Sequence, residues 1–159
     1  APKVILKIVE DCPTCVMLKH EDWPGLEKIS TLRAASDAGA RRISILCGNG
    51  GLFLPEEVER GADGAMTGFA FPEMMADVVA AVKAGDSARA RDLHDAYLPL
   101  VRYETQPGIG LAVRKYVLAK RGVIAHDTLR KPGPKLSAAT IAEVDMILER
   151  QSARLAELG

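Results

Sequence analysis

Short apolar runs alternate with amphipathic segments along the first half of the chain. Three runs have the length of strands and cover residues 15–18, 43–47 and, more weakly, 62–67. Apolar residues at helical spacing mark four other segments: residues 2–11, 24–38, 52–60 and 72–82. This alternation of strands and helices predicts parallel strands joined by right-handed crossovers.

The rest of the chain has the apolar spacing of helices only. Three helices are expected, each opened by a capping residue or a proline: Asp86 to about Val101, Pro107 to Gly122, and Ser137 onwards. Prolines in residues 128–134 exclude helix there and favour extended chain. We therefore divide the chain into an α/β segment, residues 1–85, and a helical tail, residues 86–159.

Three parallel strands make a poor sheet by themselves, because parallel sheets are normally covered on both faces and contain more strands. Either they form a small doubly wound sheet or they are part of a larger structure. The sequence also starts without methionine, and its first apolar residues, Val4 and Ile5, already have helical spacing. We therefore expect it to begin in the middle of a domain.

Composition narrows the class of protein without identifying a chemistry. The 159 residues suit one domain, and a hydrophobic content of 48% is enough to bury a core. A formal net charge of zero gives no reason to expect a nucleic-acid partner. No apolar run approaches the roughly 20 residues that cross a bilayer, and the start lacks a signal-peptide layout. The expectation is a soluble cytoplasmic protein without a membrane partner.

The three cysteines give two different signals. Cys47 lies in an apolar run and is expected to be a small buried hydrophobic residue. Cys12 and Cys15 have the C-x-x-C spacing of redox and zinc sites, but no second pair follows to complete a metal site. The pair also closes a helix, whereas a thioredoxin-like pair opens one. A turn is therefore favoured over a small redox protein, and no metal is expected.

The candidate chemistry follows the three strands. In parallel α/β folds, ligands bind at the carboxyl ends of the strands. Those ends carry Lys19-His20-Glu21, Gly48-Asn49-Gly50-Gly51 and Thr67-Gly68. A lysine directly after a buried strand loses hydration, which favours the neutral amine that attacks a ketone. The N–H groups of the glycines are candidates for holding a carboxylate.

Each of these features also has a plainer explanation. A lysine at a strand end is more often a surface residue, and a glycine-rich stretch is more often a turn. His20 and Glu21 are acid–base candidates, although charged residues after a strand usually form a solvated loop. His94 and His126 are interpreted as surface or packing residues of the tail. The catalytic interpretation gains weight because the amine and the candidate anion-binding groups fall on adjacent strand ends.

Four segments of the sequence resemble consecutive parts of one enzyme family: Val16–Lys19, Ile45–Gly50, Gly61–Gly68 and Gly122–Pro132. The family is that of dihydrodipicolinate synthase and N-acetylneuraminate lyase, and the similarity covers nearly all of the chain. It implies a TIM barrel with a helical C-terminal extension, and class I lyase chemistry through a lysine Schiff base on the sixth strand.

The resemblance assigns roles to individual residues. Lys19 matches the lysine that forms a Schiff base with pyruvate or a similar keto acid, and Gly48 matches the glycine beside that keto acid. Met66 matches an apolar position of the same pocket, and Thr67 stands where serine or threonine is frequent. Lys19 is thus the expected catalytic residue, without a cofactor, and the expected substrate-binding residues are Gly48, Asn49, Met66 and Thr67.

The resemblance begins at the helix before the sixth strand. The chain is therefore expected to be the C-terminal part of a TIM (β/α)8 barrel, with about three parallel strands, followed by a helical C-terminal extension. The family's proton-relaying tyrosine and carboxylate-binding loops would lie in a missing N-terminal half. We expect the chain to need that half as a partner, to have little or no activity alone, and to form homo-oligomers.

Two activities of the family stay open. An aldol-type synthase would condense pyruvate with an aldehyde, whereas a dehydratase would act on a 2-keto-3-deoxy sugar acid. Residues 20–23 and 49–51 differ from the more usual synthase residues, which leans slightly away from lysine biosynthesis. A non-catalytic assembly module, built on the helical tail, is the alternative of another class.

Overall fold

The sheet is organised around one central strand. The computed structural model describes residues 1–159, and its three strands are β1 (Met17–His20), β2 (Ser44–Cys47) and β3 (Gly64–Ala65). β2 pairs in parallel with β1 on one side and with β3 on the other. In the resulting register Lys19 stands opposite Leu46, and Cys47 stands opposite Ala65. The predicted parallel sheet is confirmed, although β3 is only two residues long and ends before Met66.

β1 begins two residues later than the sequence predicts, so Lys19 lies within the strand and not after it. The pairing starts where the N–H of Ser44 donates to the carbonyl of Val16 at 3.0 Å. Val16 and Met17 are 64% and 39% exposed, so the expected burial of this strand is wrong. β1 lies at the edge of the sheet, where its side chains lack the second covering layer that buries a central strand.

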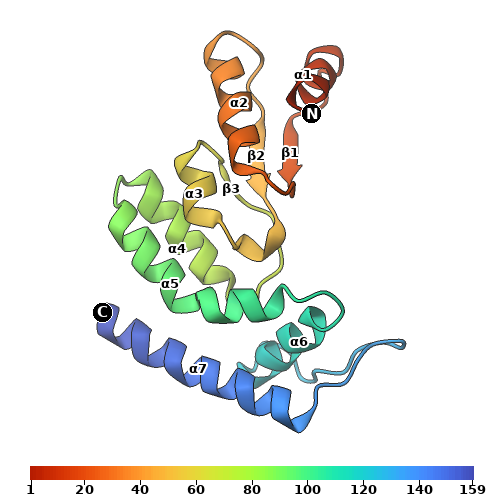
Figure 1. Cartoon of the computed structure of the whole chain (residues 1–159), viewed down its shortest axis with the longest axis vertical. Coiled ribbons are helices and arrows are strands. Elements are labelled where there is room, and N and C mark those ends of the chain that lie inside the picture. The colour runs from red at the N-terminus through yellow and green to blue at the C-terminus, as the bar shows by residue number, and fades with distance from the viewer.

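Four helices accompany the strands: α1 (Pro2–Asp11), α2 (Leu26–Asp37), α3 (Leu54–Glu59) and α4 (Pro72–Lys83), with a short 3₁₀ turn, η1 (Asn49–Gly51), before α3. Figure 1 shows α1 and α2 beside the strands at one end of the molecule, and α3 and α4 in its middle. The four predicted helices are confirmed with small shifts at their ends. α2 begins at Leu26 and not at Pro24, because Gly25 takes the N-cap position.

The tail consists of α5 (Ser87–Glu104), α6 (Gly110–Lys120) and α7 (Ala138–Leu158). Asp86 and Ser137 cap α5 and α7 as predicted, and each accepts a backbone N–H, at 3.0 and 3.1 Å. α6 begins at Gly110 instead of Pro107. A Cβ at Gly110 would overlap the carbonyl oxygen of Glu104, so glycine is needed where the chain folds back after α5.

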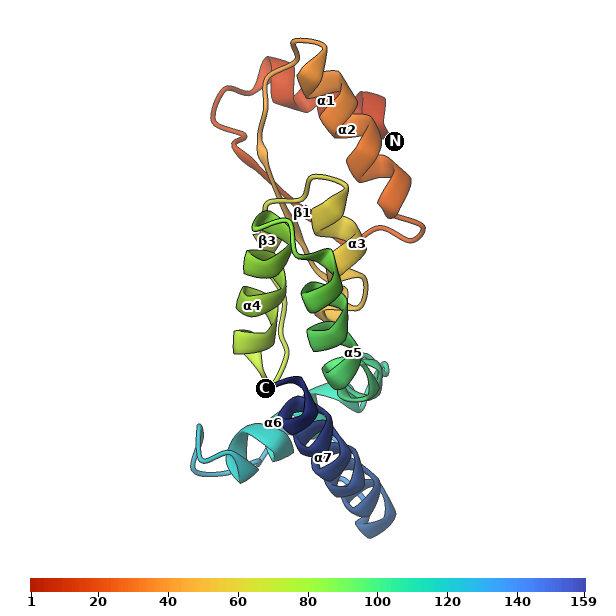
Figure 2. The same ribbon diagram turned by 90° about the vertical axis from the view of Figure 1, so that its left-hand side faces the viewer.

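The tail packs against the α/β segment and does not stand apart from it. α5 lies against both α4 and α7, and Figure 2 shows α7 crossing the foot of the molecule beside α6. The larger core joins the two parts: it takes Leu54 and Val78 from α3 and α4, and Leu100, Val113 and Val144 from the tail. No helix of the chain combines the length and the apolar character needed to span a membrane.

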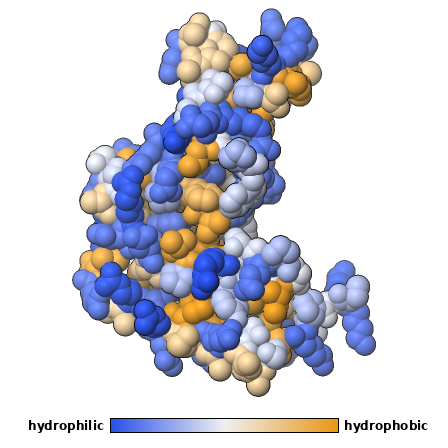
Figure 3. Space-filling view, in the orientation of Figure 1, coloured by the Kyte–Doolittle hydropathy of each residue, from blue (hydrophilic) through white to orange (hydrophobic).

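Apolar surface is exposed on the face that Figure 3 shows, where hydrophobic atoms gather in the middle and lower parts of the molecule. Large exposed apolar side chains include Val16 and Met17 at β1 and Met66 just after β3. Trp23 and Phe53 are also exposed, and their rings meet edge to face at 5.1 Å between centroids. Apolar surface of this kind is typical of a face that another layer of protein covers.

A partly buried ion pair ties α2 to β2 and β3. Arg33 donates to the carboxylate of Asp63 at 2.6 Å and to the carbonyls of Gly61 and Ile43 at 2.6 and 2.9 Å. Asp63 also accepts the N–H of Ile45 at 2.8 Å. The pair therefore satisfies backbone groups at the starts of β2 and β3 while it holds α2 across them.

A second buried carboxyl has no ion-pair partner. The side chain of Glu57, on α3, is only 4% exposed, and its Oε2 has no hydrogen-bond partner. Burial raises the pKa of Glu57 to about 7, although a hydrogen bond with the thiol of Cys47 opposes the rise. Cys47 is fully buried, as predicted, and burial raises the pKa of its thiol.

Replacing Asp63 with alanine should lower the free energy of unfolding by about 2–4 kcal/mol, because it removes the carboxylate that neutralises the Arg33 guanidinium and leaves the Ile45 N–H without its acceptor. Urea unfolding followed by circular dichroism measures the loss. Glu157→Ala removes a matched exposed ion pair, the one with Arg154, and should cost less than about 0.5 kcal/mol. Equal losses in the two variants would contradict a structural role for the Arg33–Asp63 pair.

Glu57 should make the fold less stable as the pH rises. Its pKa moves from an ordinary 4.5 to about 7 on folding, so between these values the unfolded chain releases a proton that the folded chain keeps. The contribution, up to about 3 kcal/mol, is present below about pH 4.5 and is lost above about pH 7. Urea unfolding at about pH 5 and about pH 8 measures it as the difference between wild type and Glu57→Gln.

Glu57→Gln should therefore be more stable than wild type at about pH 8, with the advantage vanishing at about pH 5. Glu149→Gln, which replaces an exposed glutamate of α7, is the control and should follow the wild-type pH dependence. If Glu57→Gln also follows the wild-type pH dependence, the carboxyl of Glu57 is not held in its protonated form by burial.

Candidate functional site

An open pocket of about 480 Å³ lies at the carboxyl ends of the three strands. Three of the expected site residues line it together: Lys19 from β1, Asn49 from η1 and Thr67 from the segment after β3. Gly48 and Met66 are not among its lining residues. Gly48 is buried beneath the side chain of Glu21, and Met66 is 39% exposed.

Lys19 lies at the open side of this pocket. Its side chain is 45% exposed, and its Nζ forms an ion pair with Oε1 of Glu21 at 3.5 Å. The sequence predicts dry surroundings for this amine, and that expectation is wrong for the chain by itself. The cause is the edge position of β1, which leaves the face of the strand around Lys19 uncovered.

The glycine-rich turn after β2 uses its N–H groups within the chain. The N–H of Gly48 donates to the carbonyl of His20 at 2.8 Å, and that of Gly51 donates to the carbonyl of Gly48 at 3.1 Å. The N–H of Gly50 donates to the hydroxyl of Thr67 at 2.8 Å. The expectation that these glycines hold a carboxylate through their N–H groups is therefore wrong, because each group already has an acceptor.

The turn gains its shape from backbone conformation and from support beneath it. Asn49 and Gly50 have φ angles of 53° and 68°, in the left-handed region that glycine and asparagine tolerate best. His94, on α5, is buried, and its Nε2 lies 3.0 Å from the carbonyl oxygen of Gly51. His94 is thus a packing residue, as expected, and it fixes the turn from the side of the tail.

The other two histidines, His20 and His126, differ in their burial. His20 is the last residue of β1 and is only 2% exposed, so the expectation of a solvated loop at this position is wrong. Burial lowers the pKa of His20, and the positive charge of Lys28 lowers it further. His126 is exposed, in agreement with its interpretation as a surface residue. None of the three histidines lines the strand-end pocket.

The tail contributes residues to the pocket that the sequence did not indicate: Glu104, Thr105 and Arg114. The Nε of Arg114 donates to Oε2 of Glu104 at 2.8 Å, and the N–H of Ala70 donates to Oε1 at 3.2 Å. Burial raises the pKa of Glu104, while the ion pair with Arg114 opposes that rise. These residues lie far from any strand in the sequence, so no local pattern assigns them to a strand end.

The C-x-x-C segment forms a turn, as predicted. α1 ends at Asp11, and the N–H of Cys15 donates to the carbonyl of Cys12 at 2.9 Å. Both cysteines are free, with Cys12 exposed and Cys15 partly buried. The segment lies at the end of the sheet that is opposite the strand-end pocket.

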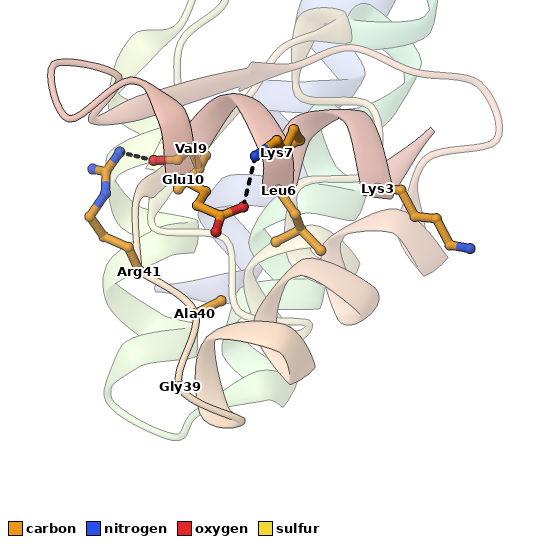
Figure 4. A pocket seen from close by; sticks show the side chains of 8 residues that line it. All are labelled: Lys3, Leu6, Lys7, Val9, Glu10, Gly39, Ala40 and Arg41. Carbon is orange, nitrogen blue, oxygen red and sulfur yellow. Dashed lines mark hydrogen bonds and ion pairs between the residues drawn. The ribbon is translucent and has the colours of Figure 1, made fainter.

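A larger pocket of about 600 Å³ lies elsewhere, between α1 and the loop that leads into β2 (Figure 4). Arg41 donates to the carbonyls of Val9 and Cys12 at 2.5 and 2.9 Å, and Lys7 pairs with Glu10 at 3.4 Å. Arg41, Lys7 and Glu10 are therefore engaged with α1 and its end, and none of the expected site residues is present. The expected residues Lys19, Asn49 and Thr67 lie instead in the smaller pocket at the strand ends.

Comparison with known proteins places the chain in a family. The sequence model of the Dihydrodipicolinate synthetase family matches residues 2–151. An L-2-keto-3-deoxyarabonate dehydratase of Azospirillum brasilense is 35% identical over 105 residues, which are 65% of this chain and 33% of the relative.

Solved structures agree with that result. The dihydrodipicolinate synthase of Rhodopseudomonas palustris is 60% identical with a TM-score of 0.92, over 94% of this chain and 50% of that one. YagE of Escherichia coli, determined in complex with pyruvate, shares the fold with a TM-score of 0.76 at 18% identity, over 96% of this chain and 51% of that one.

The chain spans about half the length of these solved relatives and a third of the curated one. Its three parallel strands and their helices, with the helical C-terminal end, are a portion of the TIM-barrel architecture of those proteins. These relatives include proteins named as synthases and one named as a dehydratase. Both the sequence match and the fold show that the chain belongs to the dihydrodipicolinate synthetase family.

Proposed function

We propose that this chain supplies the Schiff-base lysine and part of the keto-acid pocket of a lyase that acts on pyruvate or another 2-keto acid. Lys19 is the proposed nucleophile. The observation that carries the proposal is the shared pocket: Lys19, Asn49 and Thr67 come from three different strand ends and line one cavity. In parallel α/β folds, that edge of the sheet is where substrates bind.

The chemistry requires a neutral amine near a carbonyl carbon. The amine of Lys19 adds to the keto carbon, and loss of water from the adduct leaves an imine that withdraws electrons from the neighbouring carbon. Glu21 is the carboxylate nearest to the amine, at 3.5 Å, and is suited to accept the proton that the ammonium group must lose first. Thr67 and Asn49 offer hydroxyl and amide groups to polar atoms of the keto acid.

The exposure of Lys19 bears on where this activity occurs. An amine in open solvent keeps its proton at neutral pH, so the reaction gains from a second wall that dries the pocket. We propose that the remainder of a family barrel supplies that wall, with the family's proton-relaying tyrosine. The relatives are about twice as long as this chain, which supports the proposal.

Two activities of the family compete. A condensation or cleavage of the aldol type is favoured by the 60% identity with a dihydrodipicolinate synthase. A dehydratase that acts on a 2-keto-3-deoxy sugar acid is favoured by the 35% identity with a keto-deoxyarabonate dehydratase. Both reactions begin with the same imine on Lys19, so the shared step is the one that the pocket of this chain supports best.

Borohydride trapping tests the shared step. Pyruvate and sodium borohydride should add one reduced keto acid to Lys19, as read by peptide mass spectrometry, in a mixture with the part of the Rhodopseudomonas palustris enzyme that this chain does not cover. The chain alone should form much less adduct, because its pocket is open to water.

Lys19→Met should abolish the adduct, whereas Lys7→Met, which removes an exposed lysine of α1, should leave it unchanged. Absence of any adduct on Lys19 in both samples would refute the Schiff-base proposal. In that case, self-association of the chain would leave the assembly module as the remaining function. Where the adduct forms, product analysis with an added aldehyde or with a 2-keto-3-deoxy sugar acid separates the two activities.

A further inference from the structure

The strand-end pocket contains a second basic group besides Lys19, and it comes from the tail. Arg114, on α6, lines the pocket with its guanidinium group against Gly68. A Cβ at Gly68 would overlap Nη1 of Arg114, so the absence of a side chain at Gly68 leaves room for the guanidinium in its present position. The guanidinium of Arg114 therefore lies directly against the backbone of the segment that follows β3.

The guanidinium is oriented by one bond and leaves its other donors unused. Its Nε is fixed to Glu104, whose side chain is 1% exposed and is also held by the N–H of Ala70. Nη1 and Nη2 of Arg114 have no acceptor within the chain, although the side chain is 27% exposed. A planar guanidinium that is held at Nε presents its terminal amino groups in a fixed direction, which suits a carboxylate.

Neighbouring groups leave Arg114 as the natural anion partner in this pocket. Lys19 is paired with Glu21, and the N–H groups of Gly48, Gly50 and Gly51 are all donated within the chain. The hydroxyl of Thr67 accepts from the N–H of Gly50, so its own hydrogen remains free to donate. Thr67 adjoins Gly68, which brings a hydroxyl donor next to the guanidinium.

Lys19 and Arg114 lie at different places in the pocket, so they suit different parts of a substrate. Nζ of Lys19 is held by Glu21, whose side chain packs on Gly48 at the end of β2. Arg114 lies at Gly68, beyond the end of β3, one strand further across the sheet. Neighbouring strands are about 5 Å apart. The carboxylate of a 2-keto acid is bonded directly to the carbon that Lys19 would attack, so it stays near Nζ, and Arg114 is placed for a group several bonds away.

We propose that Arg114 and Thr67 form an anion subsite for a second carboxylate, at the far end of an acidic keto acid or of its adduct. The subsite deepens the proposed function and rests on it, because it names a substrate that is anionic at both ends. Arg114 would bind that end bidentately through Nη1 and Nη2, with the hydroxyl of Thr67 as an additional donor.

Borohydride trapping of two matched keto acids tests the subsite. The sample is the mixture of this chain with the part of the Rhodopseudomonas palustris enzyme that the chain does not cover. 2-Oxoglutarate and 2-oxopentanoate have the same chain length, but only the first has a distal carboxylate. Arg114→Gln should raise the concentration of 2-oxoglutarate at half-maximal trapping about tenfold, the scale of one lost charge-assisted hydrogen bond, and should leave 2-oxopentanoate unchanged. Arg102→Gln, an exposed arginine of α5 outside this pocket, should change neither value.

A second variant and a second measurement separate binding from folding. Arg114→Lys keeps the charge beside Glu104 but loses the forked geometry, so its half-maximal concentration for 2-oxoglutarate should lie between those of wild type and Arg114→Gln. In the unmixed chain with Lys19→Met, glutarate should shift the Nε–H resonance of Arg114 in a nitrogen-edited NMR titration, and acetate at equal concentration should shift it less.

The possible results distinguish the subsite from the Schiff-base proposal. No adduct in wild type with pyruvate or with either of these keto acids refutes the Schiff base, while a glutarate shift at Arg114 still supports the subsite. Adducts that respond equally to Arg114→Gln for both keto acids show a structural role and overturn the subsite. Unchanged trapping of 2-oxoglutarate in Arg114→Gln, or no shift of the Arg114 resonance with glutarate, also overturns it.

Discussion

Parallel pairing on β2 is the constraint on which the rest of the structure depends. Because β1 and β3 both run in the same direction as β2, the three segments that follow them emerge at one edge of the sheet. Lys19, Asn49 and Thr67 share a pocket for that reason alone, since they are far apart in the sequence. The Arg33–Asp63 pair strengthens the same arrangement, because it holds α2 across the starts of β2 and β3.

Two buried carboxyl groups differ in their hydrogen-bond partners, and this difference determines the effect of burial on each. Glu104 and Glu57 are both about 4% exposed. Glu104 has an arginine and a backbone N–H as partners, which oppose the rise of its pKa on burial, and its carboxylate oxygen fixes Arg114 at the pocket. Glu57 lacks such a partner, and burial raises its pKa to about 7. The first carboxyl therefore shapes the pocket, whereas the second makes the fold sensitive to pH.

The exposed side of β1 links the fold to the proposed chemistry. A parallel sheet normally has protein on both faces, and here Val16, Met17 and much of Lys19 contact solvent. Met17, two residues before Lys19 and so on the same face of the strand, gains free energy when a further layer covers it. Covering that face would also dry the amine of Lys19 and so favour the neutral amine that the proposed chemistry needs.

Local patterns in the sequence determined the elements of this protein and much of its site. The apolar spacing predicted the helices, and the caps at Asp86 and Ser137 were correct, because these features depend on neighbouring residues only. The strand ends also pointed to Lys19, Asn49 and Thr67, since parallel strands bring their ends together.

Only the tertiary structure decided how those residues are surrounded. Contacts between segments distant in the sequence decide that Lys19 is exposed and that His20 is buried. They also give the glycine N–H groups their acceptors and place Arg114 of the tail at the pocket. Solvation and hydrogen-bond partners are set by what packs against a residue, and the spacing of residues along the chain does not contain that information.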